Sequence, residues 1–200
     1  MAKNNDFYFE YYQKVYNYEI ERKEKLNAAL SLPTAVCTLI IGFIGYYIQK
    51  IFQTDNDIIL IFLISGAVAV SIFIVISIYN LIESFYDYDY EYIETPRDLD
   101  NYKKELANYY QELKEKNVNE KVLDDIREHI INRFIECTEI NTQNNDWKTK
   151  KIYIAKKWLT RSLIAVLFCI IPLIILEIDK KIENKEKIHK VQIIEGIDND

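Results

Sequence analysis

The side chains that most often carry out catalysis or bind metals are sparse in this sequence and form no recognisable motif. The two histidines, His129 and His189, lie far apart, and neither has a nucleophile or a second metal ligand at a characteristic spacing. The three cysteines, Cys37, Cys137 and Cys169, have neither metal-binding nor redox spacing. We therefore expect no enzymatic activity, no metal site and no cofactor.

Glycine is also scarce, with four in 200 residues. Phosphate-binding loops and dinucleotide fingerprints need glycines to bring backbone amides close to phosphate, and the chain has no such cluster. The formal net charge of -6 gives no overall basic surface for nucleic acid. An anionic ligand would therefore need a local basic patch.

Three groups of residues within and beside long apolar stretches bear on function instead, and the first lies in residues 58–82. On an ideal helix of about 100° per residue, small and weakly polar residues of this stretch share one face about 120° wide. Such a face allows either close packing, within one subunit or an oligomer, or wetting of a pore, and the two can coexist. Its members are Ser65, Gly66, Ala69, Phe73, Ile76, Ser77 and Asn80.

The second group is an acidic stretch, residues 83–94, which has no basic residue. If several subunits surrounded an axis, its carboxylates would form a ring that concentrates cations at a pore mouth. A solvated connector is the simpler interpretation. The residues of this acidic vestibule would be Glu83, Asp87, Asp89 and Glu91.

The third group is a basic stretch, residues 147–161. It could meet lipid phosphates or an anionic ligand, and Trp147, Tyr153 and Trp158 are available for stacking. Ordinary anchoring beside a membrane is the alternative. The basic residues are Lys148, Lys150, Lys151, Lys156, Lys157 and Arg161.

Two long apolar runs must position the first two groups. Residues 30–52 and 58–82 contain one charged residue between them, Lys50. Each run reaches the ~20 residues that a helix needs to cross ~30 Å of hydrocarbon, and a soluble helix rarely stays apolar on every face for so long. Only residues 53–57 separate the runs, so they predict an antiparallel transmembrane hairpin.

The charges at the two ends of this hairpin differ. The turn contains two acids and no base, whereas Arg22, Lys23 and Lys25 precede the first run. Basic residues next to membrane helices are enriched on the cytoplasmic side, so we expect a cytoplasmic N-terminus.

Residues 6–29 predict an amphipathic helix that leads into the membrane. Its aromatic and basic residues suit either a lipid headgroup layer or packing against neighbouring protein. The predicted apolar side comprises Phe7, Tyr8, Tyr11, Tyr12, Val15, Tyr18 and Leu26.

Thr95 and Pro96 mark the start of a helix that should run to about Lys116, because threonine caps helices and proline is tolerated in the first turn. A second amphipathic helix follows over residues 122–135, and the two predict an antiparallel pair. The polar residues 141–146 predict a further break.

A third apolar run, residues 162–178, is at the short limit for a membrane span and contains Pro172. We expect a third transmembrane helix, with a re-entrant or buried segment as the alternative. Residues 191–197 could form a short strand.

Together these elements predict an all-α membrane protein with a transmembrane hairpin, a soluble helical insert, a third transmembrane helix and a short C-terminal tail. The expected regions are an amphipathic helix (1–29), the hairpin (30–82), a cytosolic helical domain (83–160), the third transmembrane helix (161–178) and the tail (179–200).

In this organisation the chain resembles small three-span membrane effectors of bacterial anti-phage defence, including the channel subunit of Hailong-type systems. The resemblance covers most of the chain. It is carried by the N-terminal helix, the hairpin, the helical insert, the segment 141–147 that leads through Arg161 into the third run, and residues 190–194. The hairpin alone is also similar to two-span SLATT effectors, from which the third run departs.

The resemblance implies a homo-oligomeric channel or pore in the bacterial inner membrane, with the N-terminus and middle domain in the cytosol. It also implies gating through the cytosolic part by a nucleotide or short oligonucleotide that a partner nucleotidyltransferase makes, and depolarisation of the membrane when the channel opens. The alternative from the residues alone is a non-conducting membrane anchor for a helical interaction module.

Overall fold

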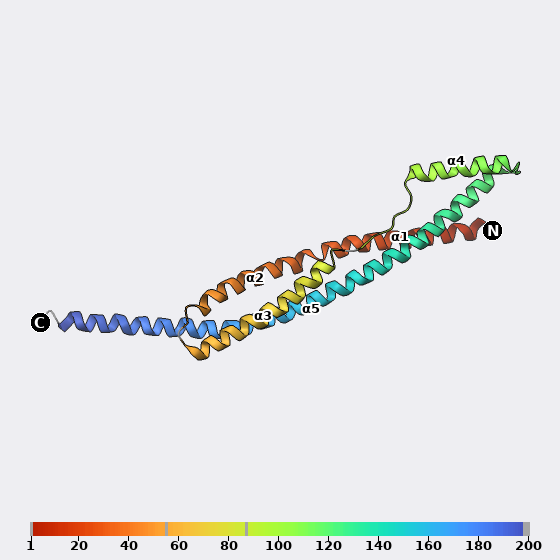
Figure 1. Cartoon of the computed structure of the whole chain (residues 1–200). Helices are drawn as coiled ribbons and strands as arrows, with labels where there is room; N and C mark the ends of the chain where they lie inside the picture. The colour runs from red at the N-terminus through yellow and green to blue at the C-terminus, as the bar shows by residue number, and fades with distance from the viewer. Residues whose placement is uncertain (1, 55, 87, 198–200) are drawn as a thin grey trace. The chain divides into compact units, whose positions relative to one another are not determined.

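The computed structural model describes residues 2–54, 56–86 and 88–197, and within them the regular structure is all helical (Figure 1). The helices are α1 (Ala2–Ala28), α2 (Ser31–Ile51), α3 (Asp57–Glu83), α4 (Pro96–Glu112) and α5 (Val118–Ile197). The prediction of an all-α fold is confirmed.

The chain divides into two compact units, which we describe separately. Unit 1 comprises Met1–Ala29 and Glu83–Lys151, and unit 2 comprises Leu30–Ile82 and Ile152–Asp200. The N-terminal helix is thus grouped with the residues that follow the hairpin. The division within α5 falls between Lys151 and Ile152, earlier than the boundary at residue 160 that we expected.

Unit 2 is built from three apolar helical segments: α2, α3 and the part of α5 that contains residues 162–178. Each belongs to a helix that is long and apolar enough to cross a membrane. Their composition and length are those of a multi-pass membrane protein.

Contacts within unit 2 define the direction of each segment. The Ser77 hydroxyl of α3 donates to the carbonyl of Ala155 at 2.9 Å, and further back along α3 Gly66 faces the Cys169 thiol. The residue numbers fall along α3 as they rise along α5, so these two helices are antiparallel. At the C-terminal end of α2, Lys50 forms an ion pair with Glu177 of α5 at 2.5 Å. The third run therefore lies alongside the hairpin and ends where α2 ends.

The predicted break at residues 141–146 is wrong, because α5 is helical without interruption from Val118 to Ile197. The same finding overturns the strand expected at residues 191–197. Buried positions of α5 recur every seven residues, the spacing that keeps one side of a helix against its neighbours. They are Phe134, Asn141, Lys148, Ala155, Ser162, Cys169 and Leu176.

The helical pair of unit 1 is confirmed. Thr95 caps α4 by accepting a hydrogen bond from the Asp98 amide at 3.3 Å. The Tyr102 ring lies 4.7 Å from that of His129, and the Tyr110 hydroxyl donates to Asp125, so α4 runs antiparallel to the start of α5 (Figure 1).

The predicted apolar side of the N-terminal helix is only partly covered within unit 1, where Tyr12, Val15 and Leu26 are half-buried. Phe9 and Tyr16 contact the Phe134 ring of α5, with ring centroids 5.6 and 5.5 Å apart respectively. Several aromatic residues assigned to the apolar side are instead exposed; these are Phe7, Tyr8, Tyr11 and Tyr18.

Candidate functional site

The small-residue face predicted on α3 is mostly occupied by packing within unit 2. Ser77 is fully buried and bonded to α5, and the Phe73 ring lies 5.5 Å from Trp158. The buried Asn80 amide donates to the Ile76 carbonyl of its own helix at 2.8 Å. A β-carbon on Gly66 would lie 2.6 Å from the Cys169 sulfur, so glycine permits this close approach.

The remaining part of that face borders an apolar cavity of about 310 Å³ between α3 and α5. Ser65, Gly66 and Ala69 line it from α3, and Pro172 lines it from α5. The Ser65 hydroxyl donates to the Phe62 carbonyl at 3.0 Å, which satisfies it within its own helix. These contacts are those of helix packing inside one subunit.

A second face of small and weakly polar residues, on α2, was not singled out from the sequence. On an ideal helix its members fall within about 80°. A β-carbon on Gly42 or Gly45 would meet nothing within 4 Å. We call this face the α2 stripe; it comprises Ser31, Thr34, Thr38, Gly42, Gly45 and Gln49, all of them exposed.

The α2 stripe points away from the interior of unit 2, because the buried side of the same helix carries Pro33, Cys37, Ile40 and Tyr47. The Thr34 and Thr38 hydroxyls donate to carbonyls four residues earlier, at 2.8 and 3.1 Å. The exposed face of α3, by contrast, carries large apolar residues such as Ile61, Val68 and Val75. The alternating spacing of three and four residues from Ser31 to Gln49 was the signal in the sequence.

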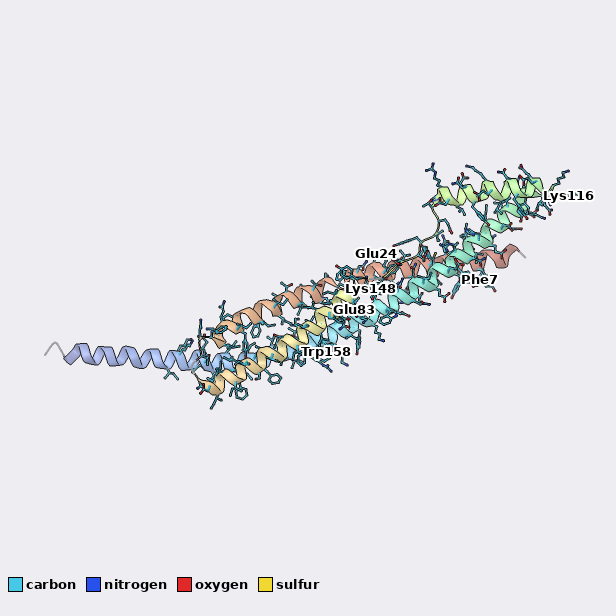
Figure 2. All side chains as sticks on the ribbon, viewed as in Figure 1. Phe7, Glu24, Glu83, Lys116, Lys148 and Trp158 are labelled. Carbon is cyan, nitrogen blue, oxygen red and sulfur yellow. The ribbon has the colours of Figure 1, made fainter. Side chains whose placement is uncertain are left out.

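The acidic stretch is paired with basic residues of α5 within unit 1. Glu83 forms an ion pair with Lys151 (Figure 2 labels Glu83), and Arg133 pairs with Glu94 at 2.6 Å and with Glu91 at 3.7 Å. Asp89 is exposed. Asp87 lies outside the described residues. The predicted acidic and basic groups therefore partly neutralise each other.

Three asparagines of α5 hold the acidic stretch, two of them through its backbone and one through a tyrosine side chain. The Asn141 amide accepts from the Glu91 N–H and donates to the Glu91 carbonyl, both at 2.9 Å. Asn144 donates to the Asp89 carbonyl at 2.7 Å. Asn145 accepts from the Tyr90 hydroxyl at 2.8 Å. We call this arrangement the asparagine clamp.

The clamp extends to α1 through buried polar groups. Asn145 also donates to the carbonyl and the carboxylate of Glu19, both at 2.8 Å. The buried Glu19 lies 3.4 Å from Arg22, which in turn contacts Asp146 at 2.6 Å. Among the described side chains, no buried polar atom of this chain of contacts lacks a hydrogen-bond partner, as a buried network requires.

Lys148, labelled in Figure 2, is buried beside this network rather than exposed to a ligand. Its ammonium donates to the Asn27 side chain and lies 5.7 Å from the centre of the Tyr88 ring. Burial lowers the pKa of Lys148, and the nearby Lys23 lowers it further. Burial also raises the pKa of Tyr90 to about 12.

The predicted basic patch is thus divided by orientation. Lys148 and Lys151 contact protein groups of unit 1, whereas Lys150 is exposed and lies 5.3 Å from the centre of the Trp147 ring. In unit 2 the Arg161 guanidinium lies 4.3 Å from the centre of the Trp158 ring. Lys156, Lys157 and Arg161 are exposed.

Among the side chains that the structure describes, no three histidine, cysteine or acidic residues come together in a way that could hold a metal ion. The cysteines are free and buried. No family model, curated protein or solved structure matches the chain.

Proposed function

We propose that the protein is a homo-oligomeric membrane channel or pore-forming effector in which the α2 stripe faces neighbouring copies or the conduit. The exposed position of the stripe is the observation that carries this proposal. Large apolar side chains suit lipid, whereas small residues and hydroxyls in a membrane helix are typical of helix contacts or of a wet surface.

This proposal moves the conduit from α3 to α2. Ser77 and Asn80 of α3 are buried and satisfied within one chain. In a ring of subunits the glycines of the α2 stripe would allow close approach between copies, and the Thr38 hydroxyl and the Gln49 amide would offer polar groups to water or ions. α3 then supports α2 from behind.

The ion pair between Lys50 and Glu177 supports a third complete crossing, because it places the end of the third run beside the end of α2. Three crossings put residues 179–197 on the side of the 52–56 turn, opposite the cytosolic N-terminus. Single cysteines at Thr54 and Lys190, in a chain without native cysteines, should react with an impermeant maleimide from the same side. Reaction from opposite sides would contradict a third crossing.

Unit 1 is the proposed gate. Its acidic stretch continues directly from α3 and is held by the asparagine clamp, so a ligand that tightens or loosens the clamp would act on the end of a membrane helix. The resemblance to anti-phage effectors in the bacterial inner membrane makes a nucleotide or short oligonucleotide from a partner nucleotidyltransferase the proposed ligand. Exposed Lys150 beside Trp147 offers charge and a stacking surface for such a ligand.

The decisive measurement is membrane potential, followed with a voltage-sensitive dye in bacteria that express the chain with and without its genomic neighbour. Thr38→Leu/Gly42→Leu should reduce depolarisation at least tenfold, because bulk on the α2 stripe blocks close approach and removes a hydroxyl. Val68→Phe/Val75→Phe, which adds bulk to the exposed face of α3, is the matched control and should conduct normally. Equal activity of both variants, or an unchanged potential with inserted protein, would overturn the proposal.

A membrane-anchored interaction module is the second candidate, and a groove in unit 1 favours it. This groove of about 600 Å³ is lined by Phe9 of α1 and by Leu123 and Ile130 of α5, with charged residues at its edge. Leu123 is 60% exposed, and an exposed leucine beside an apolar groove is typical of a surface that binds another protein. If Leu123→Ser abolished function while changes to the α2 stripe had no effect, the module would be the better description.

A further inference from the structure

A groove in unit 2 combines an apolar wall with a basic rim. Its volume is about 340 Å³, and it lies between the C-terminal part of α2 and the end of the apolar part of α5. Tyr46, Leu173, Ile174 and Ile178 supply the apolar and aromatic surface, and Glu177 and Lys181 stand at its polar end. Tyr46, Ile174 and Ile178 are about half exposed, so the groove is open to its surroundings.

The charges at the polar end are unequal. Lys50 lies 2.5 Å from Glu177 and 5.5 Å from the centre of the Tyr46 ring, and Lys180 and Lys181 are close enough to act on the same carboxylate. Among the described side chains of this rim, three lysines therefore face one glutamate. The ion pair uses one positive charge, and among the side chains that the structure describes no second acid forms an ion pair with Lys180 or Lys181.

The apolar and basic side chains of the groove follow one another along α5 in the same order as the acyl chain and the headgroup of a lipid. Leu173 and Ile174 lie one turn before Glu177 on α5, towards the apolar run, and Lys180 and Lys181 lie one turn after it. Tyrosine and lysine are favoured at the boundary between hydrocarbon and headgroups, where a ring can remain in the apolar layer while an ammonium reaches phosphate.

We propose that this groove binds one anionic phospholipid of the surrounding bilayer, with its phosphate on Lys180 and Lys181 and an acyl chain along Leu173, Ile174 and Ile178. Basic grooves between membrane helices are known to bind anionic headgroups. The ion pair with Glu177 holds Lys50 beside the Tyr46 ring, so the rim of the groove keeps its shape when the lipid is absent. The inference rests on the proposed insertion of unit 2 into a membrane, and it does not require that the protein conducts ions.

Tyr46→Trp provides a direct reporter, in full-length protein whose Trp147 and Trp158 are replaced by phenylalanine. The protein is reconstituted in two sets of vesicles, each made of phosphatidylcholine with one fifth of the lipid as phosphatidylglycerol. In one set brominated phosphatidylglycerol carries the label, and in the other an equal amount of brominated phosphatidylcholine carries it. We expect brominated phosphatidylglycerol to quench this tryptophan more strongly than an equal amount of brominated phosphatidylcholine. Each lysine near an anionic lipid contributes about 1 kcal/mol, which corresponds to roughly fivefold in relative affinity.

Lys180→Gln/Lys181→Gln should remove the preference, whereas Lys156→Gln/Lys157→Gln, on another exposed part of α5 in unit 2, should leave it intact. Equal quenching by the two lipids in the parent protein, or a preference that survives Lys180→Gln/Lys181→Gln, would overturn the lipid site. Loss of the preference on addition of glycerol phosphate would assign the site to free phosphate rather than to lipid. No quenching by either lipid would show that unit 2 is not inserted and would overturn the lipid site. A lipid preference in a protein that conducts no ions would support the lipid site and contradict only the proposed channel.

Discussion

The buried positions of α5 keep one seven-residue spacing in both units, but different residues occupy them. In unit 1 the buried positions are Phe134 and then the polar Asn141 and Lys148, whereas in unit 2 they are Ala155, Ser162, Cys169 and Leu176. A polar core in unit 1 specifies one partner, because each amide must find a particular donor or acceptor. Small residues in unit 2 allow helices to approach closely, and in the bilayer that we propose for this unit apolar side chains would gain little from leaving their surroundings.

This comparison also explains how α5 contacts the other segments within each unit. The asparagine clamp recognises the backbone of residues 89–91 through hydrogen bonds, so its specificity depends on geometry and not on apolar area. Gly66 and Ser77 instead admit a neighbouring helix by being small. A substitution in unit 1 should therefore lower stability most when it removes a polar group. A substitution in unit 2 should lower stability most when it adds volume.

The largest effect is expected from Asn141→Ala/Asn145→Ala in unit 1. The change leaves the Glu91 amide and carbonyl, the Tyr90 hydroxyl and the buried Glu19 without their asparagine partners, and we expect a loss of about 3 kcal/mol of local stability. Backbone hydrogen exchange over residues 88–94 should become roughly a hundredfold faster.

Asn132→Ala is the control for the clamp, because Asn132 is exposed on the same helix. Exchange over residues 88–94 should be unchanged in this variant. If both variants exchanged equally fast, Asn141 and Asn145 would not be what holds the acidic stretch.

The sequence predicts the apolar elements well, because composition alone identifies a long apolar helix, as it does for the hairpin and the third apolar segment. The Thr95 cap and the antiparallel pair were predicted from the capping residues and from the spacing of apolar residues. The predicted break at residues 141–146 failed because asparagine is a poor helix former when its amide has no tertiary partner, and the partners of Asn141 and Asn145 lie 50 and 126 residues away.

The candidate site was predicted less well, for a related reason. A small-residue face is visible on α3 and on α2 alike, but only tertiary packing decides which of the two is covered. Ser77 is bonded to α5, whereas Gly45 has open space beside it. Likewise, the sequence shows that Glu83 is acidic and Lys151 basic, but not that they pair with each other.

A smaller effect is expected in unit 2 from Gly66→Leu. The new β-carbon would lie 2.6 Å from the Cys169 sulfur and 3.1 Å from the Tyr47 hydroxyl, so α3 and α5 must separate or bend. Overpacking of this kind costs about 1–3 kcal/mol. Thermal unfolding in detergent should therefore occur at lower temperature than for Val68→Leu, whose side chain is exposed on the same helix. Equal midpoints for the two variants would show that the α3–α5 contact does not need glycine.

The smallest effect is expected from the titration of Lys148, and its sign follows from its burial. The pKa of Lys148 is lowered in the folded protein, so folding disfavours the charged amine. As pH rises through the lowered pKa towards the unfolded value of 10.5, the folded state releases this proton before the unfolded state does, and the stability of unit 1 should rise. Cys137 of unit 1 opposes this trend as pH approaches 9, because burial raises its pKa and the unfolded thiol ionises while the folded one keeps its proton. Tyr90 opposes it above pH 10, where the unfolded tyrosine ionises while the folded one, with its pKa raised to about 12, keeps its proton. The contribution of Lys148 is therefore measured as a difference from a variant that lacks its charge.

The measurement is hydrogen exchange over residues 88–94 between pH 7 and 9.5, corrected for the intrinsic pH dependence of exchange and compared with Lys148→Met. Methionine fills the space of the lysine stem beside Tyr88 without a charge, so protection in the parent should gain on protection in this variant as pH rises. Lys150→Met, which removes an exposed lysine two residues away, should follow the parent. If the parent lost protection relative to Lys148→Met between pH 7 and 9.5, burial of Lys148 would be outweighed by its contacts with Asn27 and the Tyr88 ring, and the polar core of unit 1 would tolerate a full charge.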